Sequence, residues 1–417
     1  MKEFRNRALA AALLLLIGPT AVAAENRELA DQQIGAHFAI SPATLPAPAE
    51  DGAVANESEK VPRPAGALPQ VPPGFEVKVF AEGLQDARYL AVMPNGDVLL
   101  AEPTNSRVRV LRDETDAGHA TKQFTFAGGL TRPHGIAFHD GYVYIADVKA
   151  VWRYRWNPQD GTAGPAEQVT ADGALGSFQG GHSTRNIVFA PDGQHFYVSI
   201  GSTSNIAEDP APLATIKEFD AAGGEGRIFA SGTRNPVGIR FYPGNNTLFA
   251  VVNERDGLGD GLVPDYLTSV ADGGFYGWPY AYIGQHRQPG PLGDKRPDLV
   301  AKTLVPDLLF QSHSAPLGLE FYEGSQFPAE YRGDAFVSLH GSWNSGQPTG
   351  YKVVRIRFKD GKPAGGYENF MTGFWLPGTN PAQVWGRPVG LATAKDGSLL
   401  VADDVGQRVW RVHWVGK

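Results

Sequence analysis

Residues 387–403 read RPVGLATAKDGSLLVAD, and this stretch decides the fold. An arginine and a proline lead into a short apolar run, Asp396-Gly397 supplies a tight turn, and a second apolar run ends in Ala402-Asp403. Short apolar runs on both sides of an Asp-Gly turn are typical of a β-hairpin. The stretch therefore predicts two antiparallel strands joined at Asp396-Gly397.

The same signature occurs six times. Its copies start at residues 88, 132, 185, 234, 315 and 387. Four-stranded propeller blades repeat at about 40–50 residues, so the two longest intervals, before residues 315 and 387, must carry inserted loops. The sequence predicts an all-β fold, a six-bladed β-propeller over residues 74–417. A pair of β-sandwiches is the alternative, but it would not produce six copies of one signature.

The two ends of this region are expected to meet. Residues 409–412 form a further apolar strand, and residues 75–79 alternate apolar and charged side chains. A propeller must close its ring. We expect these two strands to share one sheet.

The composition agrees with many short strands. The chain has 51 Gly and 32 Pro, which punctuate turns, and 42% hydrophobic residues, which is enough to bury a core. The formal net charge is −7 and no basic run is present, so a nucleic-acid partner is not expected. The chain has no cysteine, which excludes disulfides.

The N-terminus predicts export. Lys2, Arg5 and Arg7 precede an apolar run over residues 8–17, and Ala21-Val22-Ala23 is a small-residue cleavage motif. Residues 1–24 are therefore predicted to be a signal peptide. The product is expected to be periplasmic or secreted, without a membrane anchor; an uncleaved anchor is the less favoured alternative because the apolar run is short.

Residues 25–73 differ from the rest of the chain. They are rich in Pro, Ala and acidic residues, as in the stretch 41–50. Such a composition favours an extended segment over an independent core. We expect an arm, which we call the N-terminal arm, that lies over the propeller.

Two copies begin with residues that could act in catalysis or bind a ligand. His182 follows Gly180-Gly181, and a neutral imidazole in an open loop can act as a general base near neutral pH. Arg234-Asn235 opens the fourth copy, and an arginine fork suits carboxylate or quinone oxygens. The structural alternatives are a histidine that caps a turn and an arginine that ties two blades together.

Further candidates lie at the corresponding edge of other copies. The loop 253–261 holds acids and glycines that could wrap Ca²⁺, although such loops are often solvated turns. Trp343 can stack on a flat ligand or pack in the core, and Arg387 can bind an anion. His340, His134 and His313 are additional polar candidates.

With these residues in place, the chain resembles the glucose/sorbosone dehydrogenase family, the soluble quinoprotein sugar dehydrogenases. The resemblance covers residues 74–414 and rests on four motifs in order, which are Gly181-His182, Arg234-Asn235-Pro236 with Gly238, Asn253-Glu254-Arg255-Asp256, and Gly274-Phe275-Tyr276-Gly277-Trp278-Pro279. It implies a six-bladed propeller that binds pyrroloquinoline quinone (PQQ) and Ca²⁺ and oxidises an aldose or related sugar aldehyde. It also implies an external electron acceptor.

The resemblance assigns roles by position. His182 falls at the catalytic base, and Arg234 at the arginine beside the reactive quinone carbonyl. Asn235 and Arg387 match residues that hold the cofactor, and His340 falls at a cofactor-binding position. His134 and Trp343 are predicted to bind the cofactor as further polar and aromatic candidates in their copies. The backbone carbonyls of Arg255 and Asp256 fall near those that hold calcium.

This chain departs from the glucose-oxidising branch at three positions. His340 stands where that branch has a cofactor-binding lysine, and Ser202 where it has an acidic partner for the catalytic histidine. Arg387 is a single arginine where that branch has a close pair. The pattern indicates a sister branch, since His182, Arg234 and Asn235 are present.

Two other functions fit a propeller. One is a metal-dependent lactonase or esterase, in which Glu102, Asp147 and Asp403 hold a divalent metal ion that activates water. The other is a non-enzymatic propeller that binds glycans or proteins. Fold alone does not choose among these classes.

Overall fold

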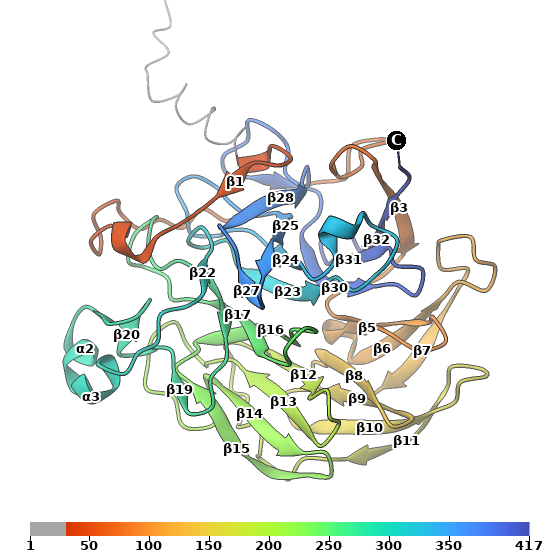
Figure 1. Cartoon of the computed structure of the whole chain (residues 1–417), viewed down its shortest axis with the longest axis horizontal. Helices are drawn as coiled ribbons and strands as arrows, with labels where there is room; N and C mark the ends of the chain where they lie inside the picture. Colours follow the sequence, from red (N-terminus) through yellow and green to blue (C-terminus); the bar gives the residue numbers. More distant parts are fainter. Residues whose placement is uncertain (1–30, 417) are drawn as a thin grey trace, which may run out of the picture.

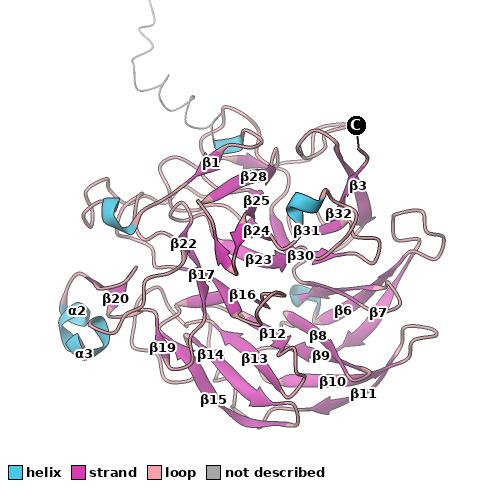
Figure 2. Cartoon of the chain, viewed as in Figure 1, coloured by secondary structure: helices cyan, strands magenta, loops and turns pink. Residues whose placement is uncertain are grey.

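The computed structural model describes residues 31–416. The predicted signal peptide, residues 1–24, lies outside the described residues. Six sheets of four or five strands follow one another round a central axis, and helices are few (Figures 1 and 2). The prediction of a six-bladed β-propeller is confirmed. In the described part of the chain, no helix is both long and apolar enough to cross a membrane.

The first three blades use consecutive strands. Blade one contains β4 (Leu90–Val92), β5 (Val98–Glu102), β6 (Arg107–Arg112) and β7 (Lys122–Gly128). Blade two contains β8 (Gly135–His139), β9 (Tyr142–Ala146), β10 (Val151–Trp156) and β11 (Ala163–Gln168). Blade three contains β12 (Arg185–Phe189), β13 (His195–Ile200), β14 (Thr215–Asp220) and β15 (Gly223–Ser231), with the short parallel β19 (Gly274–Phe275) at its edge.

The last three blades complete the ring. Blade four contains β16 (Asn235–Phe241), β17 (Leu248–Asn253), β18 (Tyr266–Ser269) and β22 (Leu308–Leu309). Blade five contains β23 (Pro316–Phe321), β24 (Ala335–Leu339), β25 (Lys352–Ile356) and β28 (Tyr367–Met371). Blade six contains β30 (Pro388–Thr393), β31 (Leu399–Asp403), β32 (Arg408–Trp414) and β3 (Phe75–Glu82).

The ring closes through strands from the two ends of the propeller. β3 pairs antiparallel with β32, so that Val77 lies opposite Val412. Figure 1 shows the orange β3 beside the blue β32. The predicted closure is confirmed.

The two long intervals carry insertions, as predicted. In blade four, the chain between β18 and β22 contains β19, β20 (Ala281–Tyr282), β21 (His286–Arg287), α2 (Pro291–Lys295) and α3 (Pro297–Val300). The interval that starts in blade five contains the hairpin β26 (Phe358–Lys359) and β27 (Lys362–Pro363), followed by β29 (Gln383–Val384).

The described part of the N-terminal arm, residues 31–73, lies on the propeller. β1 (His37–Phe38) adds to the edge of β28, and β2 (Glu59–Lys60) pairs in parallel with β29. The start of the arm is pinned by a buried ion pair in which the Lys352 ammonium lies 2.9 Å from an Asp31 carboxylate oxygen.

The repeated glycine of the signature explains how the innermost strands pack. A Cβ atom on Gly318 of β23 would lie 2.3 Å from the Val389 carbonyl oxygen of β30, and one on Gly390 would lie 2.3 Å from the Arg88 carbonyl oxygen. Real Cβ atoms do not approach backbone so closely. The glycine therefore lets neighbouring innermost strands meet round the channel, and Gly135 and Gly238 do the same at two other junctions.

We expect Gly318→Ala to destabilise the protein by about 1–3 kcal/mol, because overpacking forces backbone to move. Denaturant unfolding measures the change. Gly128→Ala is the matched control, since nothing lies within 4 Å of a Cβ atom there, and a shift within about 0.5 kcal/mol is expected. Equal stability of the two variants would contradict this account of the packing.

Candidate functional site

The loops that lead into the innermost strands surround a cavity of about 550 Å³. The residues directly before four of the six innermost strands line it, namely Thr184, Arg234, Ala315 and Arg387, and so does Arg88, which lies two residues before β4. Seven of the nine predicted site residues line this cavity: His182, Arg234, Asn235, Asp256, His340, Trp343 and Arg387. The structure thus brings together residues that are far apart in the sequence.

His182 is held in one tautomer by Ser202. Its Nδ1 lies 3.0 Å from both the carbonyl oxygen and the Oγ of Ser202. The Ser202 hydroxyl donates its hydrogen to the Ser204 carbonyl, so both oxygens can only accept from His182. Nδ1 therefore carries the proton, and Nε2 keeps its lone pair. Burial, together with the charge of Arg234, lowers the pKa of His182 to about 4, which leaves the imidazole neutral at neutral pH.

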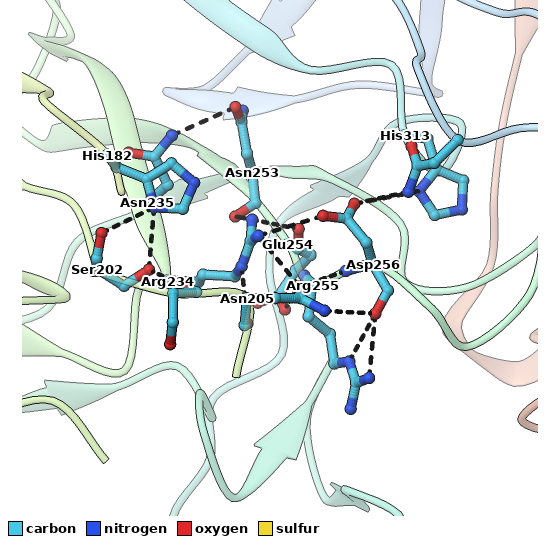
Figure 3. A network of polar contacts seen from close by, with 12 residues as sticks. His182, Ser202, Asn205, Arg234, Asn235, Asn253, Glu254, Arg255, Asp256 and His313 are labelled. Atoms are coloured by element: carbon cyan, nitrogen blue, oxygen red, sulfur yellow. Dashed lines mark hydrogen bonds and ion pairs between the residues drawn. The ribbon is translucent and has the colours of Figure 1, made fainter. Parts of the chain in front are cut away.

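Arg234 is fixed mainly by backbone carbonyls (Figure 3). Its Nε donates to the Asn205 carbonyl at 3.0 Å, and its Nη1 donates to the Glu254 carbonyl at 2.7 Å. Its Nη2 lies 3.3 Å from a carboxylate oxygen of Asp256. The guanidinium is thereby held in place, and only one carboxylate opposes its charge.

Arg387 and Arg88 form a second cationic group in the cavity wall. Arg387 donates to the carbonyls of His340 and Gly341 at 2.8 and 2.7 Å. Arg88 forms an ion pair with Asp404 at 2.7 Å. Asp404 also lies 3.0 Å from Nε2 of His340, which reaches it from the neighbouring blade.

His340 cannot serve as a permanent cation in this arrangement. Burial, with the charge of Arg387, lowers its pKa to about 4. Its Nε2 is also engaged by Asp404. His340 lines the cavity, but it presents a neutral ring there.

The two backbone carbonyls predicted to bind calcium belong to Arg255 and Asp256, and only Asp256 lines the cavity. The Asp256 carbonyl accepts from the Asn205 amide and from two nitrogens of the Arg255 guanidinium, at 2.9 to 3.1 Å. The Asp256 carboxylate accepts from Asn344 at 2.8 Å and lies 3.7 Å from Nδ1 of His313. His313 therefore supports Asp256 at the cavity wall.

His134 lies outside the residues that line the cavity. It is buried, and its ring centroid is 5.8 Å from that of Tyr89. Burial, with the charges of Arg88 and Arg185, lowers the pKa of His134 to about 3. His134 was predicted to bind the cofactor as a polar candidate in the second copy, but its ring packs with Tyr89 outside the cavity wall.

The three carboxylates that the lactonase alternative requires, Glu102, Asp147 and Asp403, are already engaged in hydrogen bonds and ion pairs within the propeller. Asp147 accepts from three backbone amides, and Asp403 accepts from two amides and the Trp410 indole. Glu102 pairs with Arg107 and Arg109. None of the three lines the cavity, and residues 31–416 contain no group of three His, Cys, Asp or Glu arranged to hold a metal. These positions do not support a hydrolytic metal site.

The TrAA12-like family model matches residues 69–263 and 298–415, most of the propeller. This chain belongs to the TrAA12-like family. The match leaves out the arm up to residue 68 and the insertion 264–297, which contains the predicted motif 274–279.

The chain is also similar to individual proteins and solved structures. An uncharacterised protein of Borreliella burgdorferi is 28% identical over 83% of this chain and 90% of its own length. A PQQ-dependent pyranose dehydrogenase of Coprinopsis cinerea is 26% identical over 81% of this chain, which spans about half (53%) of that relative. A solved structure of a Trichoderma reesei family AA12 enzyme superposes with a TM-score of 0.72 at 22% identity, covering 83% of this chain and 97% of the other. The holo PQQ domain of the Coprinopsis cinerea pyranose dehydrogenase gives 0.71 at 21% identity, covering 86% and 100%.

The cavity residues that sequence reasoning missed include three charged side chains of this TrAA12-like chain, Arg88, Glu57 and Lys60. Arg88 opens the first copy, so alignment of the six copies with Arg234 and Arg387 could have found it. Glu57 and Lys60 come from the N-terminal arm. No repeat or motif in the sequence marks them, because the pairing of β2 with β29 brings them to the cavity.

We expect nuclear magnetic resonance to give a pKa of about 4 for His182 in the cofactor-free protein. Arg234→Gln should raise this pKa by about one unit, because a nearby cation disfavours the imidazolium. His340 is the internal control, since the neighbouring cation that lowers its pKa is Arg387. An ordinary pKa near about 6.5 for His182 in the wild type would contradict the described environment.

Proposed function

We propose that this chain is a quinoprotein oxidoreductase that uses pyrroloquinoline quinone to oxidise an aldose or a related sugar aldehyde. The observation that carries the proposal is a cavity with two groups of fixed cations and a neutral histidine base, His182, beside one of them. The relatives from Coprinopsis cinerea and Hypocrea jecorina are named as PQQ-dependent pyranose and sugar dehydrogenases.

The cavity suits the cofactor in charge and size. PQQ is a flat tricarboxylate, and Arg88, Arg234, Arg387 and Lys60 line the wall. Two carboxyl groups of the cavity wall repel an anion less than ionised carboxylates would. Burial raises the pKa of Glu254 to about 8 and that of Asp265 to about 7, which favours their neutral forms. The cavity also lies within the range of about 300–1,000 Å³ that is common for ligand sites.

The bound quinone supplies a hydride acceptor for the sugar carbon. His182 acts on the substrate: its Nε2 lone pair takes the proton of the sugar hydroxyl at C1. The Ser202 carbonyl keeps the ring oriented, and Arg234 supplies a fixed positive charge beside the reacting centre. Trp343, which is 46% exposed at the cavity, offers a face on which a sugar or the flat cofactor can stack. The electrons then leave to an external acceptor.

The chain reconstituted with PQQ and calcium should reduce a redox dye when an aldose is added. His182→Ala should lower this turnover by about 10²–10⁴-fold, the scale of a lost general base, with little change in PQQ affinity. Ser202→Ala is the matched variant: it keeps the carbonyl that orients the ring, so a loss below about tenfold is expected. No dye reduction with any aldose would overturn the proposed function, whereas near-normal turnover in folded His182→Ala would remove only the assigned base.

We also propose that calcium accompanies the quinone. The Asp256 carbonyl would have to give up its Asn205 and Arg255 donors to bind a cation. Free oxygens are nevertheless present: Oε1 of Glu254 and Oδ1 of Asn344 are buried without a hydrogen-bond partner among the described residues, and both residues line the cavity. Carboxylate, amide and carbonyl oxygens are the ligands that Ca²⁺ prefers. These two oxygens and the Arg255 carbonyl are the proposed ligands.

Calcium should then tighten PQQ binding by about tenfold or more, which corresponds to about 1.4 kcal/mol. Titrations of PQQ in chelator and in calcium measure the effect, with magnesium at the same ionic strength as the control. Glu254→Gln should reduce the gain, because an amide cannot ionise to give calcium a negatively charged ligand. Equal PQQ affinity in chelator and in calcium would rule out the proposed site.

The proposed setting of the reaction is outside the cytoplasm. The signal peptide predicted for residues 1–24 would direct the chain to the periplasm or the medium. A sugar substrate and an external electron acceptor would be met there.

A further inference from the structure

We propose that Lys60, on the N-terminal arm, is a cofactor-binding residue that supplies a carboxylate partner which the propeller itself lacks. This inference rests on the proposed function, because the carboxylate is one of those on PQQ. It concerns a part of the chain that the family match, which starts at residue 69, does not include.

The first support is that the arm is a fixed part of the structure. The Asp31–Lys352 ion pair is nearly inaccessible, with the two side chains 5% and 0% exposed. Next to the cavity, the Asn56 amide donates to the Trp343 carbonyl at 2.7 Å, and its side chain donates to the Ser345 carbonyl at 2.8 Å. A segment that is bonded to the propeller at both places is already ordered, so it can contact a ligand without a further loss of conformational entropy.

The second support is the backbone of Lys60 itself. Its neighbours on both sides bond to the segment of β29: the Glu59 amide donates to Ala382, just before this strand, at 2.8 Å, and the Val61 amide donates to Val384 at 2.9 Å. β29 ends three residues before Arg387. The backbone of Lys60 is therefore fixed beside the segment that leads to Arg387.

The third support is charge. The Lys60 ammonium forms no hydrogen bond or ion pair with any residue in the range 31–416, although it belongs to the cavity wall. Arg88 is paired with Asp404, and the ring of His340 is neutral. A ligand carboxylate near Arg387 would meet Arg387 and Lys60 as its unneutralised cations.

Glu57 provides an opposing charge on the same segment. It also lines the cavity, and its charge acts on Arg387. Removing the charge of Lys60 and removing the charge of Glu57 should therefore change the affinity for an anion in opposite directions.

The experiment measures the equilibrium affinity of the full chain for PQQ in calcium, by calorimetry or by quenching of tryptophan fluorescence. Lys60→Gln should weaken PQQ binding about fivefold, the upper value for loss of an ion pair at an exposed position. Lys60→Arg should keep the affinity within about threefold, and Glu57→Gln should tighten it. Lys302→Gln, at an exposed lysine outside the cavity, is the control and should bind like the wild type. Salt at about 1 M should narrow the difference between wild type and Lys60→Gln.

The outcomes separate this inference from the proposed function. Wild-type protein that binds no PQQ would overturn both. PQQ affinity that is unchanged in Lys60→Gln, in a wild type that binds PQQ, would overturn the role of Lys60 alone. If Lys60→Gln changes only the KM for acidic sugars and leaves PQQ affinity unchanged, Lys60 would bind a substrate carboxylate, and the cofactor assignment would be wrong. Thermal unfolding of each variant confirms that the fold is intact.

Discussion

The close approach of the innermost strands is the constraint on which the rest of the structure depends. At Gly318 and Gly390, the carbonyl of the next strand occupies the space where a side chain would begin. Innermost strands that pack this closely begin at the same height along the channel axis. The loops that lead into these strands then lie at the same mouth, and for this reason Arg234 and Arg387, from different blades, line one cavity.

The way these arginines are held preserves their charge. Arg387 is fixed by two backbone carbonyls, and Arg234 by two carbonyls and one carboxylate. Carbonyl dipoles orient a guanidinium and satisfy its donors, but they carry no net charge. A full ion pair for each arginine would have neutralised the wall. The cavity therefore keeps a positive field with rigid geometry, which is what a polycarboxylate ligand requires.

The sequence predicts different parts of this molecule to different degrees. The six blades follow from a repeat, and His182, Arg234 and Arg387 follow from their place at the start of a copy. The partner of His340 could not be predicted, because Asp404 reaches it across a blade junction. The sequence also could not predict that Lys60 lines the cavity, since its position depends on a parallel pairing with a strand more than 320 residues away. Repeats encode register within blades, whereas these contacts depend on how separate segments meet.

The support of His182 differs from the acidic partner that the resemblance to the sugar dehydrogenases implies, because Ser202 contacts its Nδ1 instead. A carboxylate behind an imidazole orients the ring and also stabilises its protonated form. The Ser202 carbonyl orients the ring by accepting the Nδ1 hydrogen, and this hydrogen bond favours the imidazolium without supplying a full negative charge. The more remote charges of Asp256 and Asp209 also favour the imidazolium, but burial and Arg234 outweigh all three. A protonated His182 is therefore a stronger acid than an ordinary histidine, and it gives its proton more readily to solvent or to a neighbouring base.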